Sequence, residues 1–91
     1  MQRAEQITAS LHSKIVDNIE DSPMELGKKL AEVIYNEGLG SEADGLMKQV
    51  GQMVNSAQSA AGRKERIKSN EGFISAQSAV EKTLSDIISK K

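Results

Sequence analysis

The sequence predicts an all-α protein that self-associates: a bundle of three or four antiparallel helices, or a long helical hairpin. Apolar residues recur three and four residues apart along most of the chain, and no segment alternates with the period of two expected of a strand. Ser, Pro and Gly fall between the apolar segments, where helices begin and end. The 91 residues include one Tyr, one Phe and no Trp, so a second copy would add buried area that this aliphatic core lacks.

The first helix is expected over residues 3–20. Its larger apolar residues recur every four positions and form one slowly drifting stripe, made of Ile7, Leu11, Ile15 and Ile19. The segment Asp21-Ser22-Pro23 ends this helix, because a residue that precedes proline is disfavoured in the helical conformation. A stripe of this kind is buried against a neighbouring helix, so the first helix needs a partner.

The second helix is expected over residues 23–37. Ser22 is placed to accept a hydrogen bond from the backbone of Glu25, and proline follows it at the first helical position. The apolar arc of this helix is wide, and it extends from the leucines to Met24 and Tyr35. The width of the arc predicts that this helix is the most buried one.

The third helix is expected over residues 42–61. Gly38 suits the left-handed position that ends the second helix, and Ser41 is placed to cap the third. The third helix carries a heptad-like seam of small apolar residues, which is expected to pack against the broad face of the second helix, against the same helix of a second copy, or against a protein partner. The interface residues expected on this seam are Leu46, Val50, Met53, Val54 and Ala57.

The last helix is expected over residues 70–89, from a stripe that begins at Phe73. This stripe is out of phase with the seam of the third helix, so the chain is expected to break or kink in a junction over residues 62–69. At its length the chain, residues 1–91, is expected to be a single helical domain.

Four basic residues gather in the junction and form a candidate anion-binding site: Arg63, Lys64, Arg66 and Lys68. Nucleic acid or a phosphorylated small ligand would be the partner of such a cluster. A solvated basic turn is the simpler interpretation, because the cluster contains no aromatic residue that could stack on a base. Anion binding is therefore the alternative function.

The sequence offers no catalytic or metal-binding constellation, so no enzyme, cofactor or metal is expected. His12 is the only histidine, and the chain has no cysteine that could complete a metal site with it. The serines fall on predicted polar helix faces, and no G-x-S-x-G turn accompanies them. The pentapeptide Ser-Ala-Gln-Ser-Ala occurs at 56–60 and again at 75–79, a match too short to indicate a repeated unit.

The function predicted from the sequence is that of a small regulatory protein without catalytic activity: an oligomeric adaptor, chaperone or inhibitor that binds a protein partner through apolar helix faces. The formal net charge of −1 gives no overall field that would attract nucleic acid or an anionic membrane. The first residues are too polar for a signal peptide, and no window approaches the roughly 18 apolar residues of a membrane span. A cytoplasmic location is expected, and export by a route that needs no cleaved signal is also compatible with the sequence.

Overall fold

The computed structural model describes residues 2–60, 67 and 69–90. The described helices are α1 (Arg3–Asp17), α2 (Pro23–Asn36), α3 (Ala43–Ser59) and α5 (Glu71–Lys90), with the short 3₁₀ helix η1 (Gly40–Glu42) before α3. None of the described residues lies in a strand. The expected all-α bundle is therefore confirmed.

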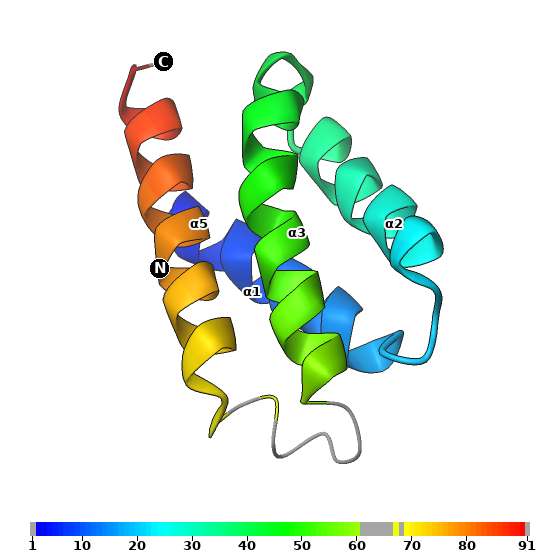
Figure 1. Ribbon diagram of the computed structural model, residues 1–91. Helices are drawn as coiled ribbons and strands as arrows, with labels where there is room; N and C mark the ends of the chain where they lie inside the picture. The colour runs from blue at the N-terminus through cyan, green and yellow to red at the C-terminus, as the bar shows by residue number, and fades with distance from the viewer. Residues whose placement is uncertain (1, 61–66, 68, 91) are drawn as a thin grey trace.

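The helices α2, α3 and α5 lie side by side and alternate in direction, with α3 between the other two (Figure 1). Helix α1 crosses behind this layer and packs against both α5 and α2. The molecule measures 39 × 23 × 20 Å, so the chain forms a bundle and not the long hairpin. Helices α3 and α5 are separate and antiparallel, as the phase shift between their stripes predicts.

Helix α1 ends at Asp17, three residues earlier than the sequence predicts. Asn18 provides the reason, because its backbone N–H and its side-chain Nδ2 both donate to the carbonyl of Lys14, at 3.1 and 2.8 Å. A side chain that binds a nearby carbonyl in this way competes with continuation of the helix. Lys29 of α2 then holds the turn, since its Nζ donates to Asn18 Oδ1 at 2.9 Å and pairs with the Asp21 carboxylate.

Both ends of α2 follow the sequence signals. The N–H of Glu25 donates to Ser22 Oγ at 3.2 Å, so Ser22 caps the helix as expected. At the other end Gly38 has a φ of 78° and donates to the carbonyl of Tyr35 at 3.0 Å, while Leu39 donates to the carbonyl of Ile34 at 3.1 Å. These two bonds form a Schellman motif, which only a residue tolerant of positive φ can close easily.

The expected cap of the third helix is wrong. Ser41 lies inside η1, and the residue at the N-cap of α3 is Glu42, whose side chain accepts no capping bond. The Schellman motif sends Leu39 into the core, and the N–H of Glu42 then donates to the Leu39 carbonyl at 3.0 Å. The chain therefore enters α3 through a 3₁₀ turn, in which the Leu39 carbonyl takes the place of a capping side chain as hydrogen-bond acceptor.

The prediction that the second helix is the most buried one is also wrong, because α3 holds that position. The buried residues of α3 are Ala43, Leu46, Val50, Met53, Val54 and Ala57, whereas those of α2 are Leu26, Leu30 and Ile34. Met24 and Tyr35 are 71% and 61% exposed. Helix α2 lies at the edge of the layer, so only part of its wide apolar arc faces other helices (Figure 1).

Candidate functional site

The residues expected at a partner interface lie in the hydrophobic core of the single chain. Leu46, Val50, Met53, Val54 and Ala57 are between 0% and 4% exposed. Helix α3, which carries them, packs against α5, α2 and α1 of the same chain. A second molecule could reach these side chains only if the bundle opened, so their role in partner binding stays a prediction.

The candidate anion-binding residues lie outside the part of the chain that the structure describes: Arg63, Lys64, Arg66 and Lys68. Ile67, between two of them in the sequence, is described and belongs to the hydrophobic core. Anion binding by the four basic residues therefore stays a prediction as well.

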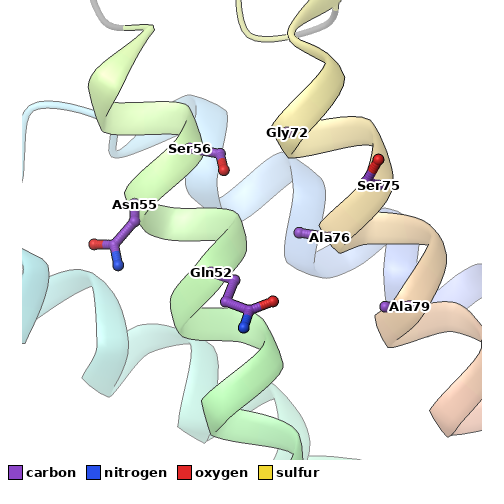
Figure 2. A pocket seen from close by; sticks show the side chains of 7 residues that line it. All are labelled: Gln52, Asn55, Ser56, Gly72, Ser75, Ala76 and Ala79. Carbon is purple, nitrogen blue, oxygen red and sulfur yellow. The ribbon is translucent and has the colours of Figure 1, made fainter.

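A shallow groove between α3 and α5 is the candidate functional site, and Figure 2 shows it from close by. Its volume is about 370 Å³, and its lining residues are Gln52, Asn55, Ser56, Gly72, Ser75, Ala76 and Ala79. Gln52 and Ser56 point from α3 towards α5, and Ala76 and Ala79 point from α5 towards α3 (Figure 2). Asn55 points away from α5, so it forms the outer edge of the groove.

One end of the groove is set by the close approach of α3 to the first turn of α5. A Cβ atom on Gly72 would lie 3.1 Å from Ser56 Oγ, so glycine at this position allows the two helices to meet. Asn70 orders the same turn, because its Oδ1 accepts a hydrogen bond from the N–H of Phe73 at 2.9 Å, as an N-cap residue does. Phe73 is buried in the core, which anchors this end of α5.

Among the described residues, the lining of the groove carries no ionisable side chain, because it consists of amides, hydroxyls and small apolar groups. Amide and hydroxyl groups both donate and accept hydrogen bonds, so the groove can match polar groups of either kind. The described lining residues offer no ion to pair with a charge that a ligand would bury, and such an unpaired charge is costly. The lining is therefore suited to an uncharged surface.

A buried oxygen lies on the same side of α3 as the groove. Gln49 Oε1 is buried and accepts no hydrogen bond from any described residue. Gln49, Gln52 and Ser56 follow one another at spacings of three and four residues, which places them on one side of the helix. A buried acceptor without a partner costs about 1–3 kcal/mol, so an apolar side chain at position 49 is expected to stabilise the fold.

His12 joins α1 to α5 and lies at the boundary between core and surface. Its Nδ1 is 2.7 Å from Gln77 Oε1, and because an amide carbonyl oxygen only accepts, the imidazole Nδ1–H is the donor. The ring also packs edge-to-face on Phe73, with 5.2 Å between the ring centroids. Both contacts hold α1 against α5, so the geometry gives His12 a structural role.

The two Ser-Ala-Gln-Ser-Ala pentapeptides have matching environments, which the sequence interpretation missed. Their first serines line the groove and their first alanines are buried in the core. Each glutamine binds another part of the chain: Gln58 Nε2 donates to the carbonyl of Asp21 at 2.8 Å, and Gln77 binds His12. The repeated pentapeptide was the sequence feature from which this match could have been predicted, because identical residues at the same spacing occupy equivalent faces of two packed helices.

The described residues form neither a metal-binding cluster nor a membrane-spanning helix. Within residues 2–60, 67 and 69–90, no group of three or more His, Cys, Asp or Glu side chains is arranged to hold a metal ion. No helix in this part of the chain has the length and apolar character needed to cross a lipid bilayer.

Comparison with known proteins finds no relative of this chain. No protein-family model matches it, and neither a curated protein nor a solved structure matches it. The roles assigned to its residues therefore depend on their positions, contacts and exposure in this chain alone.

Proposed function

We propose that this chain is a non-enzymatic helical interaction module, which binds a helix of a protein partner in the groove between α3 and α5. The uncharged, hydrogen-bonding lining of this groove is the observation that supports the proposal most strongly. An adaptor, a chaperone or an inhibitor would each use such a surface, because each acts by covering part of another protein.

A helix is the occupant that suits the shape of the groove. The groove runs between two antiparallel helices, and along α5 it extends from Gly72 to Ala79. The seven residue steps from Gly72 to Ala79 rise about 10 Å, which is close to two turns. A third helix laid along two packed helices fits between their ridges, and helix-in-groove docking is a common mode of peptide recognition.

The face of the partner helix is expected to carry small, uncharged residues. Ala76 and Ala79 leave room for side chains such as Ala, Ser or Gly, and Gln52 and Ser56 can form hydrogen bonds with an amide or a hydroxyl. A Lys or Glu at the centre of the contact would lose water without gaining an ion pair. The chemistry of the groove thus favours one class of helix face over others.

Site-specific cross-linking in the native cells tests this proposal. A photoreactive residue at Ser75, in the groove, is expected to cross-link to a partner that mass spectrometry can identify. The same residue at Ser78, which is exposed three residues further along α5 and lines no part of the groove, is the matched control. Equal cross-linking from both positions, or none from Ser75, would contradict the proposal.

Binding of the partner identified in this way can then be measured with purified proteins. Ser75→Arg is expected to raise its dissociation constant by about tenfold or more, because the substitution introduces a bulky charge into a contact that offers it no counterion. Ser78→Arg is expected to leave the dissociation constant unchanged. Isothermal titration calorimetry gives both values, and equal affinities for the two variants would rule out the groove as the binding surface.

A further inference from the structure

We propose that a second copy of this chain packs on the exposed face of α2, so that two α2 helices pair in antiparallel orientation. The contact uses four residues, Met24, Lys28, Ala31 and Tyr35, which are called the α2 seam below. The proposal concerns a surface separate from the groove and does not depend on the function proposed for the groove.

The α2 seam is a second stripe on α2, distinct from the stripe that enters the core. Its residues are spaced four, three and four apart, and at about 100° per residue they fall within an arc of about 60°. Met24 and Tyr35, at its two ends, are 71% and 61% exposed and are the most exposed large hydrophobic residues among those described. This spacing is that of the contact positions in a pair of packed helices.

The spacing of the α2 seam is the same in both directions, which suits contact with an identical helix. If two copies of α2 are placed antiparallel about a point midway between Lys28 and Ala31, the two ends of the α2 seam in one copy lie level with the two ends of the seam in the other. Met24 of one copy then lies beside Tyr35 of the other, and Lys28 lies beside Ala31 of the second copy. A two-fold axis requires a patch that is complementary to itself in this way.

Charge complementarity supports the same occupant and fixes its direction. Lys28 and Glu32 are both exposed, and in the antiparallel pair Lys28 of each copy lies beside Ala31 of the second copy and one residue along the helix from its Glu32, within reach of an ion pair. A parallel pair would instead place Lys28 against Lys28 of the second copy, which is repulsive. A charged residue at the centre of a helix seam commonly fixes orientation and register, at some cost in affinity.

Two glycines adapt α2 to a close neighbour. A Cβ atom on Gly27 would meet no atom of the described residues within 4 Å, so these residues leave the space beside the α2 seam open. A Cβ atom on Gly40 would lie 2.7 Å from Tyr35 Cδ1, which shows that the tyrosine ring packs over Gly40 while most of the residue remains exposed. Tyr35 is therefore a partly immobilised aromatic anchor, which loses little conformational entropy on binding.

The expected dimer exchanges rapidly with the monomer. Helix α2 has 14 residues and is about 21 Å long, so a contact through this helix alone lies at the small end of specific protein interfaces. The fraction of dimer should therefore rise across a micromolar-to-millimolar concentration series.

Charge exchange between two variants tests the pairing. Wild-type protein is expected to shift with concentration towards twice the 9.8 kDa chain mass in sedimentation velocity. Lys28→Glu and Glu32→Lys should each raise the dimer dissociation constant by about tenfold or more, because each places like charges opposite one another. An equimolar mixture of the two variants restores opposite charges across the contact and should dimerise again.

Recovery of the dimer on mixing would support the proposal, since it requires Lys28 and Glu32 to face each other between chains. A wild-type chain that stays monomeric throughout the series would overturn it. So would single variants that dimerise as the wild type does, or a mixture that remains monomeric. Circular dichroism of each variant checks its folding, and intact helices are expected because both positions are exposed.

A pair of glycine substitutions tests the close approach independently. Gly27→Gln fills the open space beside the α2 seam and should weaken the dimer by about tenfold, while glutamine favours the helix more than glycine does. Gly45→Gln is the matched control, because Gly45 is an exposed glycine of α3 that also has no atom near its Cβ position. Equal dimerisation of the two variants would overturn the proposed contact.

Discussion

At the scale of the residue, Gln49 is a polar side chain at a position where an apolar one is expected to be more stable. Its Oε1 is buried and unpaired among the described residues, although Gln49 stands beside the core position Val50. Apolar residues of similar length are available for such a position, and methionine is the closest in shape. The cost of Gln49 can therefore be measured directly.

Gln49→Met is expected to raise the free energy of unfolding by about 1 kcal/mol, because it removes a buried acceptor that has no donor. Gln52→Met is the control, since Gln52 is exposed one turn further along α3 and should leave stability unchanged. Urea unfolding followed by circular dichroism measures both. An equal change in the two variants would mean that the buried oxygen carries no cost.

At the scale of the element, Ser22 and Ser41 show that the same sequence signal can have two outcomes. Each serine follows a turn and precedes acidic residues, and the sequence assigns a cap to each. Only Ser22 accepts a capping bond, because the chain enters α3 through η1 and leaves Ser41 within a 3₁₀ turn. The entry to a helix thus depends on the element that precedes it.

Ser22→Ala is therefore expected to lower the free energy of unfolding by about 1 kcal/mol, the usual value of a lost N-cap. Ser41→Ala should change it by no more than a few tenths of a kcal/mol, as at a surface position without a special contact. Thermal unfolding of the two alanine variants compares them under one condition. A larger loss at Ser41 would show that η1 needs its hydroxyl.

At the scale of the whole molecule, the seam of α3 is a core and not an outer surface. Met53 is fully buried, and the helices around it belong to the same chain. A substitution of Met53 should therefore lower the stability of the single chain, and any effect on assembly should follow from that loss of stability. This distinguishes the seam of α3 from the α2 seam, whose ends are exposed.

Met53→Asp is expected to cost about 3–5 kcal/mol, because it leaves a buried charge without a partner. A small domain has only about 5–15 kcal/mol of stability, so the variant should be largely unfolded or melt far below the wild type. Gln52→Asp, at an exposed neighbour, should keep the wild-type melting temperature within a few degrees. A folded Met53→Asp variant that altered only the oligomeric state would show that the seam of α3 is an interface.

The helices themselves could be predicted from the sequence because each depends on local signals. Ser22 and Gly38 bound α2, and the stripes on α1, α2, α3 and α5 supply the core. The exposure of Met24 and Tyr35 could not be predicted, since an apolar arc gives a direction but not the neighbour that covers it. The groove was missed for a related reason: Ser56 and Ser75 are ordinary polar positions until α3 and α5 are packed together.

The paired pentapeptides have a consequence for how this chain can change in length. In each of them the groove, the core and a hydrogen bond to another segment depend on successive residues of one helix. An insertion of one residue in α3 ahead of Ser56 would turn the helix after it by about 100°. Ser56 would then leave the groove, Ala57 would leave the core, and Gln58 would lose its hydrogen bond to the carbonyl of Asp21, all as the result of one insertion. Substitutions can therefore alter these three features one at a time, whereas the insertion or deletion of a residue within α3 removes them together.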